Sequence, residues 1–189
     1  MKEYIIATNN KHKVEEIEKA LGGRAKLITL RDIGFRGHIP ETSNTLEGNA
    51  KQKAEYIYNR YKIATIADDT GLEVEALGGE PGVHSARYAG DRSSFDDNID
   101  LLLEELDGKT NRKARFRTVI CLIEDGKESY FEGIARGSIS TERYGRDGFG
   151  YDPVFFPDGY GESFAEMSLD EKNKISHRGI AIRKLAKHI

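Results

Sequence analysis

Basic side chains gather where two helices are expected to begin. In ATNNKHK (7–13), a strand passes into a helix through a polar turn, with Asn10 as the expected N-cap and Lys11, His12 and Lys13 in the first turn. The free N–H groups of a helix N-terminus carry partial positive charge, so each cation there opposes folding by about 0.3–1 kcal/mol. A phosphate bound at this turn would attract both the N–H groups and the cations. A surface helix start with solvated lysines is the alternative.

The same arrangement recurs near the end of the sequence, in KNKISHRG (172–179). Ser176 is expected to cap a helix whose first two positions are His177 and Arg178, and Lys172 stands shortly before the cap. Two sites with the same unfavourable placement of charge favour ligand binding over solvated surface. From these residues alone, the ligand is an anion.

Carboxylates are expected at the end of an apolar strand, in ADDTG (67–71). An acid in that position can hold Mg²⁺ through water and phosphate oxygens, or take a proton from water. Glu41 in a polar loop, or Glu47 on the helix that follows, could complete a carboxylate metal site with Asp69. The five histidines show no zinc-ligand spacing, so oxygen ligands favour Mg²⁺ or Mn²⁺. The alternatives are an Asx turn at 68–71 and solvated loop glutamates.

Glycines surround an aromatic residue in GRDGFGYDPVFF (145–156). With little bulk around it, the ring of Phe149 could lie against a flat base, and Asp152 could accept hydrogen bonds from ring N–H groups. The alternative is a glycine-rich turn that packs its aromatic residues on the core.

Apolar periodicity predicts strands and helices that interleave along the whole sequence. Strands are expected at 3–8, 25–30, 62–69, 71–77, 114–124 and 128–139, the last two joined by the hairpin turn EDGK. Helices are expected at 9–23, 44–61, 97–106, 168–174 and from 176 onward, and 31–44 and 78–90 are expected to be loops. The opening strand-helix-strand order predicts an α/β or mixed fold, and the length predicts one domain over residues 1–189.

Composition excludes several classes of protein. The net charge is −3 and there is no long Lys/Arg run, so we expect no nucleic acid partner. A single cysteine, Cys121, excludes a disulfide framework and favours the cytoplasm. No apolar run approaches the roughly 18 residues of a membrane span, and the start of the chain does not read as a secretory signal.

Four strings, in order, resemble the inosine triphosphate pyrophosphatases, which hydrolyse non-canonical purine nucleotides. They are ATNNKHKVEEI, IADDTGLEVEALGGEPGVHSARYAG, GFGYDPVFF and FAEMSLDEKNKISHRG, and they span residues 7 to 183 with the surrounding sequence. Each string is weak alone, but the four together are specific. Asn9 stands where many members have Gly, and Thr70 where many have Ser.

The resemblance implies an elongated α/β fold with a central mixed sheet, flanking helices, two lobes and a nucleotide cleft between them. It implies a Mg²⁺-dependent cytoplasmic homodimer that converts ITP, dITP or XTP to the monophosphate and pyrophosphate. Asp69 is then the catalytic carboxylate, and Glu41 joins it at the metal. The implied substrate-binding residues are Thr8, Asn9, Asn10, Lys11, His12, Lys13, Thr70, Phe149, Gly150, Tyr151, Asp152, Lys172, His177 and Arg178.

Taken with the resemblance, the two basic segments divide their tasks. The 7–13 turn follows a strand directly and is the better phosphate site. Lys172, His177 and Arg178 become donors toward the carbonyl oxygen that marks a deaminated purine. Two alternatives remain: a pyrophosphatase of related fold for other modified nucleotides, including pyrimidines, and a nucleotide-binding module without turnover. The sequence does not indicate what would exclude guanine, nor a physical role for Ser85 or Arg87 in loop 78–90.

Overall fold

Six strands are hydrogen-bonded in the order β2-β1-β3-β4-β5-β6. The strands are β1 (Lys2–Ile6), β2 (Ala25–Thr29), β3 (Thr65–Val74), β4 (Lys113–Glu124), β5 (Lys127–Ile139) and β6 (Phe155–Pro157). β1 is parallel to both β2 and β3, whereas β5 and β6 are antiparallel. The sheet is therefore mixed, which confirms the expected α/β class.

The computed structural model describes all residues, 1–189, and the chain divides into two compact units. Unit 1 comprises Met1–Asp69, Thr118–Gly133 and Arg178–Ile189, and unit 2 comprises Thr70–Arg117 and Ile134–His177. β3, β4 and β5 each contribute residues to both units. The peptide bonds Asp69–Thr70 and His177–Arg178 are two of the points where the chain passes from one unit to the other.

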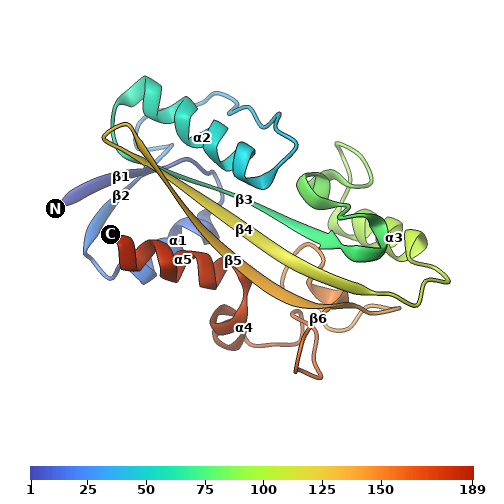
Figure 1. The fold of residues 1–189 in the computed structure, drawn as a ribbon. Helices are drawn as coiled ribbons and strands as arrows, with labels where there is room; N and C mark the ends of the chain where they lie inside the picture. Colours follow the sequence, from blue (N-terminus) through green and yellow to red (C-terminus); the bar gives the residue numbers. More distant parts are fainter. The chain divides into compact units, whose positions relative to one another are not determined.

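Unit 1 packs helices against the strands it contains. Its helices are α1 (Lys11–Leu21), α2 (Leu46–Tyr61) and α5 (His177–His188, which begins one residue before the unit). Figure 1 shows α2 on one side of these strands and α1 and α5 on the other. Ile17 of α1 and Ile182 of α5 share one buried cluster with Ile66 of β3, so this face is closed by apolar packing.

Local signals in the sequence fix the ends of these elements. The helix predicted at 9–23 ends in Gly22, whose φ of 56° is left-handed, so the glycine stop is confirmed. The β4–β5 turn places Asp125 at φ 49° and Gly126 at φ 75°. Two consecutive positive φ values are typical of the tight hairpin turn that the EDGK signal predicted.

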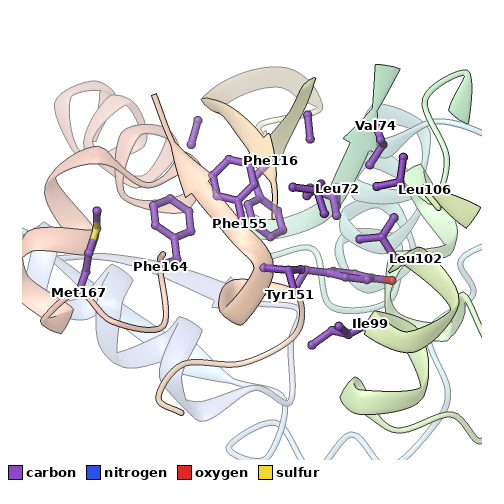
Figure 2. Packing of buried hydrophobic residues seen from close by; sticks show 14 residues of the cluster. Leu72, Val74, Ile99, Leu102, Leu106, Phe116, Tyr151, Phe155, Phe164 and Met167 are labelled. Carbon is purple, nitrogen blue, oxygen red and sulfur yellow. The ribbon is translucent and has the colours of Figure 1, made fainter. Parts of the chain in front are cut away.

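Unit 2 has its own core. It contains α3 (Phe95–Glu105) and α4 (Leu169–Ile175), each begun by a capping box, at Ser94 with Asp97 and at Ser168 with Glu171. Figure 2 shows leucines and aromatic rings of this unit packed together, including Leu72, Leu102 and Phe155. Short 3₁₀ segments, at Glu75–Leu77, Gly82–Arg87 and Asp152–Val154, connect the larger elements.

One element differs from the sequence prediction in a way that matters for the site. The two strands expected at 62–69 and 71–77 are a single strand, β3, and its last predicted residues form a 3₁₀ turn. The prediction of carboxylates at a strand end, and its alternative of an Asx turn, were therefore wrong. The acids interrupt the apolar pattern but not the strand, because basic side chains from elsewhere in the chain compensate their charge.

No helix of the protein has the length and apolar character that crossing a membrane requires.

Candidate active site

Asp68 and Asp69 lie in the middle of β3, beyond the end of its neighbour β1. The last paired residues of β1 and β3 are Ile6 and Ile66. The N–H of Ala7 still donates to the carbonyl of Ile66 at 2.8 Å, and there the chain leaves the sheet. Successive residues of a strand point to opposite faces, so the two carboxylates are separated by the sheet itself. Each meets a different lysine.

The turn after β1 has the conformation expected of a helix start. Asn10 is extended, and its Oδ1 accepts the N–H groups of His12 at 3.0 Å and Lys13 at 3.4 Å. The N–H of Asn10 itself donates to Thr8 Oγ1 at 3.2 Å. The predicted N-cap is confirmed, and the first turn of α1 carries no acid. Its basic side chains therefore add to the positive end of the helix dipole.

Lys13 reaches from this helix to Asp68, at 2.6 Å from Nζ to Oδ2. The two side chains are only 18% and 10% exposed. Burial alone would raise the pKa of Asp68, but the charges of Lys13, Lys53 and Arg178 outweigh it and hold that pKa at about 2. Asp68 is therefore fixed as a carboxylate at any physiological pH, and it positions Lys13.

Arg178 belongs to the same side of the site in unit 1. Its Nη1 lies 3.5 Å from Glu16 Oε2, and it lines one small cavity together with Lys13 and Asp68. The Arg178 side chain is buried, with the residue only 8% exposed, and it lies beside these two acids. The two basic segments that the sequence singled out thus meet here, at Lys13 and Arg178.

Asp69 occupies the other face of β3, in contact with α2. Lys53 Nζ bonds Glu41 and lies 3.7 Å from Asp69 Oδ1. Burial raises the pKa of Asp69, the charge of Lys53 and a hydrogen bond from Asn49 oppose the rise, and Glu41 adds to it. The result is a pKa above the ordinary value for Asp. A carboxylate with a raised pKa is a better proton acceptor than an ordinary one.

Asn49 links this acid to the loop before α2. It is 4% exposed, and its Oδ1 accepts the N–H of Ser43 at 2.8 Å. The NH2 group of the same amide donates a hydrogen bond to the carboxylate of Asp69. A buried amide with both ends committed holds one orientation, so Asn49 also sets the orientation of Asp69.

A divalent cation would suit this face. Glu41 and Asp69, the pair expected to hold Mg²⁺, both lie against one ammonium group, so negative charge is already gathered there and balanced by a cation. Their ligands are hard oxygen atoms, which Mg²⁺ and Mn²⁺ prefer. No group of three or more His, Cys, Asp or Glu residues in the protein is arranged so that it could hold a metal ion. Two carboxylates are nevertheless enough for Mg²⁺, which commonly keeps several waters and binds phosphate oxygens.

In unit 2, Asp152 gathers the residues expected to hold the base. This carboxylate is 2% exposed, and its Oδ2 accepts the N–H of Phe149 at 3.0 Å and forms an ion pair with Lys172. The same ammonium lies 4.8 Å from the centroid of the Phe149 ring. A Cβ on Gly148 would lie 2.4 Å from Asp152 Oδ2, and its φ of 79° is left-handed. Only glycine fits there.

The remaining predicted base residues differ in what they can offer a ligand. Phe149 is 43% exposed, so its ring is available. His177 is buried and stacks on Phe116, with 4.6 Å between ring centroids and 12° between planes. The ring of Tyr151 is buried in the unit 2 core, so a substrate could meet only its backbone. Thr70 begins unit 2 directly after Asp69.

Three residues of this site escaped the sequence interpretation: Lys53, Asn49 and the separate role of Asp68. Asn49 and Lys53 lie one helical turn apart on α2, four positions along, which places them on the same face. That spacing could have been recognised from the sequence as placing the two side chains together. The pairing of Lys13 with Asp68, 55 residues apart in the sequence, could not.

The model of the Ham1 family matches residues 4–188. The chain belongs to the Ham1 family. A relative named dITP/XTP pyrophosphatase from Flavobacterium psychrophilum is 54% identical over 181 residues, covering 96% of this chain and 95% of the relative. A second relative of the same name, from Porphyromonas gingivalis, is 53% identical over 98% of this chain and 96% of its own.

Solved structures of Ham1 proteins share this architecture throughout. The Ham1 protein of Staphylococcus aureus has a TM-score of 0.94 at 38% identity, covering 99% of this chain and 97% of that one. The HAM1 protein of Coxiella burnetii has a TM-score of 0.96 at 34% identity, covering 100% and 98%. The likeness therefore extends over nearly the full length of this chain and of each of these two proteins.

Proposed function

We propose that this protein is a nucleoside triphosphate pyrophosphatase that hydrolyses dITP, ITP and XTP to the monophosphate and pyrophosphate. The observation that carries the proposal is the setting of Asp69: a buried carboxylate of raised pKa, oriented by Asn49 and placed beside Lys53 and Glu41. A binding module has no need for such a base. The names of the Ham1 relatives at 54% and 53% identity support the substrate class.

In the proposed reaction, Asp69 accepts a proton from a water molecule as the water oxygen attacks the α-phosphorus. The bond between the α-phosphorus and the oxygen bridging to the β-phosphate breaks, and pyrophosphate leaves with that oxygen. Such reactions depend mainly on positioning and on offsetting charge. Lys13 would face the phosphates from α1 and Lys53 from α2, and Lys11 and His12 would add positive charge at the exposed end of the turn.

Mg²⁺, or Mn²⁺, would be held by Glu41 and Asp69, and when bound it supplies charge neutralisation at the phosphate oxygens. Lys53 already stands at this point, so its ammonium would pass from Glu41 to a phosphate oxygen when the carboxylates take the metal. Thr8, Asn9 and Asn10 would contribute hydroxyl, amide and N–H groups to the same phosphates, and Thr70 would contact the substrate next to Asp69.

For the base, we propose stacking on the exposed ring of Phe149, beside the Lys172 ammonium. Gly150 and the backbone of Tyr151 would lie at its rim, and Asp152 would hold Phe149 and Lys172 in place. His177 and Arg178 would donate to the oxygen at C6 of hypoxanthine or xanthine. Adenine carries an amino group there, so it would leave those donors without acceptors and be rejected.

The two sets of residues lie in different units, and the chain itself joins them. Asp69 of unit 1 is bonded to Thr70 of unit 2, and His177 of unit 2 is bonded to Arg178 of unit 1. On this basis we propose that residues 1–189 act as one catalytic domain. We further propose that the protein works in the cytoplasm as a homodimer, with no nucleic acid partner.

The proposal is tested by measuring pyrophosphate release with Mg²⁺ from ITP, XTP, dITP, GTP, ATP and a modified pyrimidine triphosphate. We expect rates with ITP and XTP at least about 10-fold above those with ATP and GTP. Replacing Asp69 by Asn should lower kcat at least about 100-fold while nucleotide binding stays measurable. Preference for the pyrimidine, or binding of ITP without turnover, would favour the two alternative functions.

A further inference from the structure

Loop 78–90, whose role could not be predicted from the sequence, is hydrogen-bonded to other parts of unit 2 at several points. Its 3₁₀ segment Gly82–Arg87 contains Ser85, which is 9% exposed. The Ser85 hydroxyl donates to the carbonyl of Gly82 at 2.6 Å. It also accepts the buried N–H of Leu72 in β3 at 2.9 Å. Ser85 is thus hydrogen-bonded to β3, the strand that carries Asp69 and Thr70. Its partner there, Leu72, lies two residues after Thr70.

The other end of Ser85 holds the segment expected to bind the base. The Tyr151 hydroxyl donates to the carbonyl of Ser85 at 2.6 Å, and both groups are buried. In Figure 2, the Tyr151 ring lies in the core between Leu102 and Ile99, with its oxygen pointing away from Phe164. The ring of Tyr151 therefore packs in the core, and the hydrogen bond of its hydroxyl to Ser85 fixes the orientation of the ring.

Helix α3 holds the same loop from a third direction. Asn98, 2% exposed, donates through Nδ2 to the carbonyl of Ala86 at 3.2 Å. Its Oδ1 accepts the N–H of Ala89 at 2.8 Å and the hydroxyl of Ser93, also at 2.8 Å. Asn98 therefore holds the backbone at Ala86 and Ala89, just after Ser85 in the sequence. These hydrogen bonds restrict the movement of the Ser85 carbonyl that Tyr151 contacts.

We propose that Ser85 is a positioning residue for base recognition: through Leu72 and Tyr151 it fixes segment 149–152 to strand β3. In the sequence, Tyr151 lies between Phe149 and Asp152. The ring of Phe149 is the proposed stacking surface and lies next to Lys172, and Asp152 accepts the N–H of Phe149. A Tyr151 that slides or tilts moves all of them together. The proposal rests on the proposed function, since it assigns the base contacts to this segment.

Tyr151→Phe and Ser85→Ala test the proposal, because each removes one hydroxyl and leaves the apolar packing in place. We expect each to raise KM for ITP about 5–10-fold, with kcat within about 2-fold of wild type. Inhibition by pyrophosphate, which has no base, should be unchanged. The double variant should resemble one single variant rather than multiply the two effects, because both break the same linkage. Ser85→Thr, which keeps the hydroxyl, should restore KM.

Tyr160→Phe is the matched control, since Tyr160 is an exposed phenol outside this linkage, and it should leave KM unchanged. An unchanged KM in folded Tyr151→Phe and Ser85→Ala would overturn the proposal. So would equal weakening of ITP and pyrophosphate, which indicates general loosening. If wild-type protein released no pyrophosphate from ITP or XTP, the proposed function would fail separately. Calorimetric binding of IMP, weakened by Tyr151→Phe or not, would then still decide the positioning role.

Discussion

Replacing Asp68 by Asn should destabilise the protein in a way that depends strongly on pH. The pKa of Asp68 falls from 3.8 to about 2 on folding, because Lys13, Lys53 and Arg178 outweigh the effect of burial. Each unit of pKa shift corresponds to about 1.4 kcal/mol, so ionised Asp68 contributes about 2.5 kcal/mol to the free energy of unfolding. Asparagine has the shape of the protonated acid and should lose that contribution.

The sign of the pH dependence follows from the direction of the shift. A carboxyl whose pKa is depressed by folding stabilises the native state above its unfolded pKa, and the contribution disappears as pH falls through the folded pKa. The difference between wild type and Asp68→Asn should therefore be full at neutral pH. It should fall to about half near pH 3 and be small near pH 2.

The measurement is urea unfolding of both proteins at a series of pH values, followed by circular dichroism. Asp107→Asn is the matched control, because Asp107 is exposed and should give a small difference at every pH. Equal stability of wild type and Asp68→Asn at neutral pH would refute the reasoning. A difference that stays constant down to pH 3 would also refute it, because the loss would then come from packing rather than from charge.

Two further variants test other contacts of the site. Replacing Lys53 by Met should raise the pKa of Asp69 further, since Lys53 lowers it, and should move the acid limb of the kcat/KM profile to higher pH. NMR titration of the metal-free protein measures the pKa of Asp69 directly. The control Lys51→Met, on the exposed side of α2, should leave the pKa of Asp69 unchanged. Gly148→Ala should lower kcat/KM about 10-fold or more, because its Cβ would lie 2.4 Å from Asp152 Oδ2. Gly159→Ala has a similar φ, 81°, with nothing within 4 Å, and if it lowered kcat/KM equally, backbone strain rather than the contact with Asp152 would be responsible.

The sequence was most informative where structure depends on neighbouring residues. The cap at Asn10, the glycine that ends α1 and the hairpin at Asp125 and Gly126 each depend on a few adjacent positions, and all were predicted correctly. Residue types at helix starts also singled out Lys13 and Arg178, which the structure places around the same carboxylate.

Predictions that depended on distant compensation were less successful. A pair of acids in an apolar strand looks like a strand end, because nothing nearby in the sequence offsets the charge. Only the fold brings Lys13 to Asp68 and Lys53 to Asp69. The role of loop 78–90 was unreadable for a related reason. The group that Tyr151 contacts is a backbone carbonyl, and every residue has one.

The alternation of β3 has a consequence for insertions and deletions. Asp68 and Asp69 serve different lysines only because they fall on opposite faces of one strand. Loss of Ala67, or gain of one residue beside it, with the pairing of Ile66 kept, would turn each acid to the other's face. Both aspartates would still be present in the sequence after such a change. Asp69, the proposed proton acceptor, would however point toward α1 instead of α2. Variants of this segment should therefore be judged by whether they change its length by an odd or an even number of residues.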